Sequence, residues 1–297
     1  MLHQETGRDD LTKRVRRIEI KTRALTNSMF AGGYHSAFKG RGMSFAEVRE
    51  YQVGDDVRDL DWNVTARLNR PHIKVFEEER ELTVMLLVDV SGSQDFGTFE
   101  RTQREQVTEI AATLAFSAIK NNDKTGLIFF SDHIEKFIPP QKGKKHILYL
   151  IRELLTFKPS SRRTDIAQAL EFMTKAMKRR CICFVLSDFI DRGERYYESL
   201  LIANRKHDVV AVRVYDHYMR NLPDVGLVKL RDAETGHEHY LDTSSRKVRE
   251  HHARWWEDNM KRTDEVFRKC GVDSVSVATQ EDYISALMVL FAKRNKL

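Results

Sequence analysis

The feature that most constrains the fold of this chain is a set of short, nearly uninterrupted apolar runs. They occupy residues 82–88, 181–186 and 209–214. A strand exposed on one face alternates apolar and polar residues, so a continuous run indicates a strand covered on both faces. Apolar residues at helical spacing follow these runs, as in residues 99–120 and 195–205. Strands that alternate with helices predict an α/β domain built on a doubly wound, mainly parallel sheet.

The first 80 residues show a different pattern. Residues 11–30 carry apolar side chains at helical intervals, and residues 72–76 have the composition of a short strand. We therefore predict an N-terminal segment at residues 1–80, with a helix and a small β extension, and the α/β domain at residues 81–297. The dense charges of residues 54–62 favour a structural collar on that domain, with contact to a partner protein as the alternative.

The charge pattern argues against nucleic-acid binding. The chain has 50 basic and 44 acidic residues among 297, a net charge of +6 and a pI of about 9.1. The two signs are interspersed, as on a solvated surface, and no aromatic stripe accompanies the basic clusters. Binding through the basic N-terminal helix stays open as an alternative, and such binding would weaken steeply with added salt.

Cysteine content and hydropathy predict a cytoplasmic protein that does not insert into a membrane. The three cysteines, Cys181, Cys183 and Cys270, are too few for a disulfide framework and are typical of reduced thiols. The apolar runs fall short of the ~20 residues that a membrane helix requires. The polar N-terminus has no signal-peptide pattern.

Polar side chains stand where two of the predicted strands end. Asp89, Ser91 and Ser93 follow the first apolar run at spacings of two residues, and Asp188 follows the second. Thr164 stands at the start of a predicted helix. In a doubly wound sheet the carboxyl ends of the strands form the ligand-binding edge. We therefore expect these five side chains to converge there.

The convergent set has the chemistry of a cation site. Its hydroxyls and two carboxylates are the oxygen ligands that Mg²⁺, Mn²⁺ and Ca²⁺ prefer, completed by water. A shell that is short of full coordination leaves room for a ligand carboxylate. Gly92 is expected to permit the tight turn between the two serines. The alternative is that these residues are helix caps, since Ser, Thr and Asp are common at that position.

The segment from Asp89 to Ser93 resembles the D-x-S-x-S signature of the metal-ion-dependent adhesion site in von Willebrand factor A domains. Thr164 and Asp188 fall where that family has its Thr and its final Asp. The resemblance implies a von Willebrand factor A-like fold of the Rossmann type. It also implies that Ser91 and Ser93 coordinate the cation directly, that Asp89 and Asp188 often act through water, and that Thr164 does either.

A second resemblance covers the N-terminal part. The sequences GMSFAEVREYQVGDDVRDLDW at residues 42–62 and HIKVFEEER at residues 72–80 resemble the hallmark of the DUF58 family. The resemblance implies an adaptor, assembly or chaperone role with a MoxR-type AAA+ ATPase or its client protein. Two departures stand out: the membrane helices that many members carry near the N-terminus are absent, and Gln94 stands where many members have Met.

Together these features predict a metal-dependent protein-interaction module that binds a partner carboxylate through its cation and is not an enzyme. The sequence has no G-x-S-x-G nucleophile elbow and no phosphate-binding G-x-x-x-x-G-K-[ST] loop. The alternative is a metal-dependent phosphoester hydrolase, because Mg²⁺ held by carboxylates also serves phosphoryl chemistry. His133 is the nearest candidate for the general base of such an enzyme.

Overall fold

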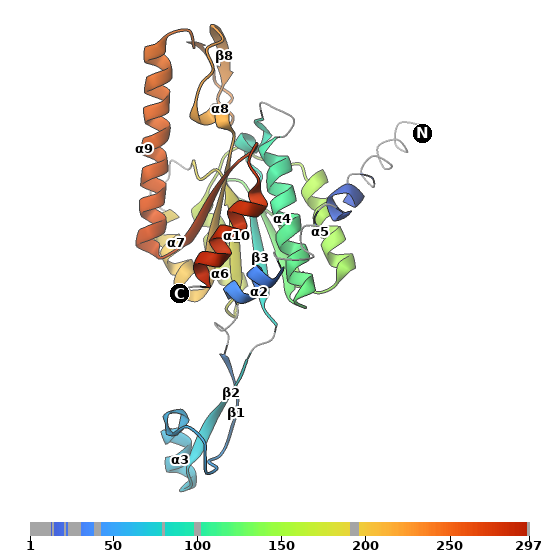
Figure 1. Cartoon of the computed structure of the whole chain (residues 1–297), viewed down its shortest axis with the longest axis vertical. Helices are drawn as coiled ribbons and strands as arrows, with labels where there is room; N and C mark the ends of the chain where they lie inside the picture. Colours follow the sequence, from blue (N-terminus) through green and yellow to red (C-terminus); the bar gives the residue numbers. More distant parts are fainter. Residues whose placement is uncertain are drawn as a thin grey trace.

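A six-stranded sheet covered by helices on both faces forms the body of the molecule (Figure 1). The computed structural model describes residues 13, 15–20, 22, 31–38, 43–78, 81–97, 102–190 and 196–295. The body contains strands β3 Thr83–Asp89, β4 Lys124–Phe130, β5 Ile134–Gln141, β6 Ile182–Ser187, β7 Asp208–Tyr215 and β10 Asp273–Ala278. They lie in the order β10–β7–β6–β3–β4–β5, and every neighbouring pair is parallel except β4 and β5. The predicted doubly wound, mainly parallel sheet is confirmed.

Successive residues of β3 point to opposite faces of the sheet, as the strand period requires. Val84, Leu86 and Val88 join the core formed with helices α4, α5 and α10, whereas Met85 and Leu87 join the core formed with α6, α7 and α9. Both faces are therefore buried, which explains the unbroken apolar run. The helices are α4 Gln103–Lys120, α5 Lys144–Thr156, α6 Ile166–Ala176, α7 Tyr196–Lys206, α9 Arg246–Cys270 and α10 Tyr283–Arg294.

The strand order reverses beside β3. The chain leaves β3 toward β4 on one side and later returns as β6 on the other. Two neighbouring strands whose connections run in opposite directions leave a crevice at their carboxyl ends, where doubly wound sheets bind ligands. This switch point places the end of β3 beside the end of β6.

Helix α2, Ala31–Phe38, packs on the body, although residues 43–78, which follow it in the chain, lie outside the body. The Phe38 ring meets Phe184 of β6 and Phe291 of α10 edge to face, with both pairs of ring centroids 5.7 Å apart, and the Arg294 guanidinium lies 4.4 Å from its centroid. Part of the N-terminal segment thus completes the α/β core. The glycine-bearing sequence around it gave no helical expectation, and the division of the chain at residue 80 stays a prediction.

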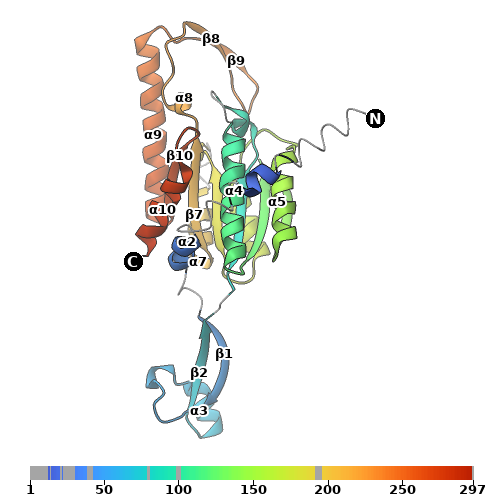
Figure 2. The ribbon, with the colours of Figure 1, turned by 45° about the vertical axis from the view of Figure 1, so that its right-hand side comes forward.

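Residues 43–78 form an arm that projects from the amino end of β3 (Figures 1 and 2). Its antiparallel strands are β1 Met43–Glu50 and β2 His72–Glu78, which enclose η2 Val57–Asp59 and α3 Trp62–Leu68. An ion pair between Arg49 and Asp55 of 2.7 Å fastens the tip. The charged residues 54–62 belong to this arm and lie away from the body, so the collar interpretation is wrong.

A second hairpin stands at the opposite end of the body, beside the start of α9 (Figure 1). Strands β8 Leu227–Arg231 and β9 Glu238–Asp242 pair antiparallel around a turn that contains Thr235 and Gly236, and α8 His217–Arg220 precedes them. Helix α9 spans 25 residues and buries Trp256 and Phe267. Within the described ranges, no helix combines the length and apolar character needed to cross a membrane.

If α2 is part of the core, Phe38→Ala lowers the free energy of unfolding by about 3–5 kcal/mol, the usual cost of truncating a buried phenylalanine. Chemical denaturation of the full chain measures this change. The matched control is Trp62→Ala on the arm, where the side chain is 71% exposed and the expected change is below about 0.5 kcal/mol. Equal stability of Phe38→Ala and wild type would contradict the assignment.

Candidate metal centre

Two buried carboxylates stand side by side at the switch point. Val88 of β3 pairs with Leu186 of β6, so the next residues, Asp89 and Ser187, are neighbours, and Asp188 follows directly. Asp89 is 1% exposed and Asp188 2% exposed. The parallel register of the two strands therefore brings together the predicted Asp residues, which lie 99 positions apart in the sequence.

Asp89 organises the loop that follows β3. Its Oδ1 atom accepts a hydrogen bond of 2.9 Å from the Ser91 backbone N–H, and its Oδ2 atom accepts one of 2.6 Å from the Ser187 hydroxyl. The Ser91 and Ser93 Oγ atoms lie 3.1 Å apart. Ser91 precedes the short helix η3, Gly92–Asp95, but its side chain forms no cap. The helix-cap alternative is therefore wrong for Ser91, whose hydroxyl is directed toward Ser93.

Asp188 has one carboxylate oxygen that is buried without a hydrogen-bond partner. Its Oδ1 atom accepts 3.0 Å from the Ile190 backbone N–H, and the Ser93 hydroxyl also bonds to this carboxylate. The Oδ2 atom is buried and has no hydrogen-bond partner among the described residues. A buried carboxylate oxygen without a hydrogen-bond partner is costly, and a bound cation is one of the groups that could satisfy it.

Burial makes this pair of carboxylates electrostatically unfavourable. Burial, together with the negative charge of Asp188, raises the pKa of Asp89 to about 7, and burial also raises the pKa of Asp188. A divalent cation between them would supply the missing positive charge and favour both ionised forms. The site thus has the charge as well as the oxygen atoms that a hard cation requires.

Thr164 lies on the loop that adjoins the serines. The Gly92 backbone N–H donates to the Arg162 carbonyl oxygen at 2.9 Å, which joins this loop to the one after β3. The N-cap of α6 is Asp165, which accepts a 3.0 Å bond from the Gln168 N–H, so Thr164 is not the cap. The structure thus brings Asp89, Ser91, Ser93 and Asp188 into one hydrogen-bonded group, with Thr164 on the neighbouring loop.

Gly92 is needed for a reason that the sequence did not reveal. Its φ angle lies outside the left-handed region. A Cβ atom on this residue would lie 2.2 Å from the carbonyl oxygen of Ala233, at the tip of the β8–β9 hairpin. Glycine therefore stands here because another backbone approaches closely. No pattern in the sequence relates Ala233 to the serine loop, so the hairpin's place beside the site was missed.

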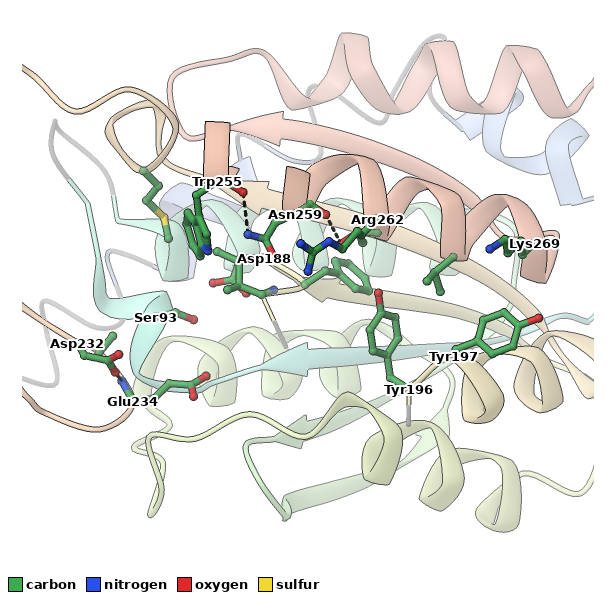
Figure 3. A pocket seen from close by; sticks show the side chains of 16 residues that line it. Ser93, Asp188, Tyr196, Tyr197, Asp232, Glu234, Trp255, Asn259, Arg262 and Lys269 are labelled. Carbon is green, nitrogen blue, oxygen red and sulfur yellow. Dashed lines mark hydrogen bonds between the residues drawn. The ribbon is translucent and has the colours of Figure 1, made fainter. Parts of the chain in front are cut away.

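A cavity of about 1020 Å³ opens beside the carboxylates. Figure 3 shows Ser93, Asp188 and Glu234 at one end and Lys269 and Tyr197 toward the other. The wall between them comes from α9 and α7 and includes Trp255, Asn259, Arg262, Val266 and Tyr196. At 1.5 Å per residue, the α9 stripe from Trp255 to Lys269 extends about 21 Å. The centre thus adjoins a groove that is aromatic and basic away from the carboxylates.

His133 is engaged outside this centre. Its Nδ1 atom lies 2.9 Å from Asp132 Oδ1 and its Nε2 atom 3.0 Å from Ser160 Oγ. The bond to Asp132 and the nearby Glu135 raise the pKa of His133. This geometry does not direct the imidazole at the carboxylates, so the structure does not favour His133 as the general base of a phosphoester hydrolase.

The chain Ser160–His133–Asp132 has the connectivity of a nucleophile, a base and an orienting acid. The Glu135 carboxylate nevertheless accepts hydrogen bonds from the groups that acyl transfer would use, the serine hydroxyl and the backbone N–H groups beside it. It accepts the Ser160 hydroxyl at 2.8 Å and the backbone N–H groups of Ser160 and Ser161 at 2.9 and 3.1 Å. These contacts close the loop against β5, and we assign the cluster a structural role.

The donor set is oxygen-rich and contains few acidic residues. In the described part of the chain, no group of three or more His, Cys, Asp or Glu side chains is placed to hold a metal ion. The two carboxylates and the serine hydroxyls include only two side chains of these types, Asp89 and Asp188. This donor set fits a cation that takes hydroxyls and water as ligands.

Comparisons with known proteins agree with this architecture. Residues 47–262 match the family described as "Protein of unknown function DUF58". An uncharacterized protein of Mycobacterium tuberculosis is 29% identical over 300 residues, which covers 100% of this chain and 93% of that protein. The family match spans most of the arm, the serine loop and most of α9.

Solved structures resemble the chain in fold. BatB from Bacteroides thetaiotaomicron superposes with a TM-score of 0.51 at 17% identity, over 73% of this chain and 100% of that chain. A von Willebrand factor type A protein from Catenulispora acidiphila gives a TM-score of 0.39 at 10% identity, over 72% of this chain and 42% of that one. The predicted α/β fold class is confirmed by the sheet topology itself.

If Asp89 and Asp188 repel each other without a cation, Asp188→Asn raises the free energy of unfolding of the chelator-treated protein by about 1 kcal/mol. Asparagine keeps the shape of the side chain and removes one buried charge. Denaturation in excess chelator measures the effect. Asp59→Asn, which removes an exposed charge on the arm, is the control and is expected to change nothing. Destabilisation by Asp188→Asn would contradict the repulsion.

Proposed function

This chain belongs to the DUF58 family, and on that premise we propose that it is a cation-dependent protein-interaction module that binds a carboxylate of a partner protein. The observation that carries the proposal is the Oδ2 atom of Asp188, which is buried and has no hydrogen-bond partner among the described residues. The Ser93 hydroxyl bonds to the Asp188 carboxylate and lies 3.1 Å from the Ser91 hydroxyl, and both Ser93 and Asp188 line the large cavity. A bound cation would satisfy this oxygen, and the adjoining cavity would give a partner's carboxylate access to the cation.

The residues present fit a hard divalent cation. The Ser91 and Ser93 hydroxyls would coordinate directly, and the Asp89 and Asp188 carboxylates would do so directly or through water. Thr164 is available from the adjoining loop. Mg²⁺ is the cation we favour, with Mn²⁺ and Ca²⁺ as substitutes of the same ligand preference.

Binding accounts for the site better than a reaction does. A phosphoester hydrolase requires a base near the cation to activate water. His133, the candidate from the sequence, bonds instead to Asp132 and Ser160. The proposal therefore assigns no catalytic residue and no reaction to this chain.

The partner we propose is a MoxR-type AAA+ ATPase, or the client protein on which it acts, in the cytoplasm. The family resemblance suggests this partner, and the cavity supports the type of contact. Arg262 and Lys269 line the groove beyond the cation position. A partner segment that presents one carboxylate to the cation and further acidic residues to these cations would be complementary in charge.

Titration with Mn²⁺ alone tests the cation site. We expect the wild-type chain to bind Mn²⁺ and Ser91→Ala to bind at least about tenfold more weakly, because a direct ligand is lost. Ser274→Ala, on the exposed face of the edge strand β10, is the control and should match wild type. Isothermal titration calorimetry gives the affinities. Absence of Mn²⁺ binding by the wild-type chain would refute the proposal.

The partner is tested separately. The immobilised wild-type chain should retain a purified MoxR-type ATPase from the same genome in Mg²⁺ and should release it in excess chelator. The immobilised Asp188→Ala variant should not retain the ATPase in Mg²⁺. Arg262→Glu should weaken retention at constant Mg²⁺ affinity, since it changes the groove and leaves the cation ligands unaltered. Retention that chelator does not affect would show that the cation does not mediate this contact.

A further inference from the structure

The far end of the arm exposes apolar side chains that the arm itself does not cover. Large apolar residues are exposed there: Val53, Val57, Trp62 and Leu68. Of the apolar side chains that the structure describes between residues 47 and 75, Ile73 alone is buried. A two-stranded hairpin that stands by itself is only marginally stable in water. Grouped apolar residues on such an exposed element are typical of a protein-interaction surface.

Helix α3 and its C-cap carry the largest of these side chains on one continuous face. Spacings of three and four residues place four positions on that face: Trp62, Thr65, Ala66 and Asn69. Together with Arg70 and Pro71 they line a hollow of about 370 Å³, which is large enough to accept an indole ring. The face therefore begins with a large exposed ring and continues with short side chains beside open space.

Opposite charges stand at the two ends of α3. Asp59, which precedes the helix, is exposed, and Arg70, which follows it, has 73% of its side chain exposed. Arg70 lies 3.3 Å from Glu50, but both side chains are exposed, and surface ion pairs of this kind contribute little. A second α3 that runs antiparallel to the first would bring Arg70 of each chain toward Asp59 of the other.

We propose that α3 is a self-association surface on which a second copy of this chain packs antiparallel about a twofold axis. In this arrangement Trp62 of each chain occupies the hollow of the other, over Ala66 and Asn69, so a large side chain meets short ones. The twofold axis makes each ring contact and each charge contact occur twice. The occupant is a second copy because the two ends of this surface complement each other in size and in charge.

The contact leaves the candidate metal centre accessible. Helix α3 lies at the far end of the arm, and the arm projects from the amino end of β3 (Figures 1 and 2). The candidate metal centre lies at the carboxyl end of the same strand. Two chains joined at α3 therefore hold both centres away from the shared contact, and the inference does not depend on the proposed function.

Sedimentation velocity of the full chain in excess chelator tests the contact, since chelator excludes association through a cation. We expect wild type to pass from monomer to dimer between nanomolar and high micromolar concentration. Trp62→Ala should weaken the dimer at least about tenfold, because both indole rings are lost from its centre. Val289→Ala shortens a side chain on α10 that is 70% exposed, as Trp62 is 71% exposed, and should dimerise like wild type.

An exchange of charges tests the antiparallel direction. Asp59→Arg and Arg70→Asp should each dimerise roughly tenfold more weakly than wild type, because like charges then face each other across the twofold axis. An equimolar mixture of these two variants should regain the wild-type affinity, since each altered residue then meets the opposite charge on the other chain.

A wild-type chain that stays monomeric at every concentration would overturn the proposal, and so would equal dimerisation of wild type and Trp62→Ala. Charge variants that dimerise like wild type, or a mixture that does not recover, would overturn the antiparallel arrangement. At nanomolar concentration, where the copies are separate, Trp62→Ala and wild type should show the same thermal unfolding by circular dichroism. Loss of the dimer is thereby distinguished from loss of the fold.

Discussion

The parallel pairing of β3 with β6 is the constraint on which the candidate site depends. It places Asp89 and Asp188 next to each other at the carboxyl edge, where burial raises the pKa of both carboxyl groups. The two strands are covered on both faces, so the carboxylates cannot separate without disturbing the cores on either side. The sheet thus holds two carboxyl groups close together at a place where burial disfavours their ionised forms.

Most of the body was predictable because a strand that is buried on both faces appears in the sequence as an unbroken apolar run. Unbroken apolar residues marked β3 and β6, and helical periodicity marked α4 and α7. The N-terminal part was predicted less well. Helix α2 contains two glycines in a short segment, and only its contacts with Phe184 and Phe291 reveal that it belongs to the core. The dense charges of the arm suggested packing on the body, whereas they bond mainly within the arm, as Arg49 does with Asp55.

The candidate site was predictable to the extent that its residues follow strands. Asp89, Ser91, Ser93 and Asp188 converge as their positions after β3 and β6 required. Ser187, which bonds to Asp89, ends the same strand that Asp188 follows and was within reach of the same reasoning. Ala233 and Glu234 were not, because the path of a hairpin inserted between β7 and α9 depends on tertiary contacts. The glycine at position 92 is consistent with a close approach of another backbone, but a glycine in a turn does not identify which backbone approaches it.

The arm and the candidate metal centre lie at opposite ends of one strand. The arm's β2 ends at Glu78, β3 begins at Thr83, and β3 ends at Asp89. A force applied between the arm and the carboxyl edge of the sheet would therefore act along the axis of β3. In that direction the hydrogen bonds to β4 and β6 are loaded together, in shear, instead of opening one after another. The central strand is thus expected to resist extension along its own axis better than in a direction that would open these hydrogen bonds one at a time.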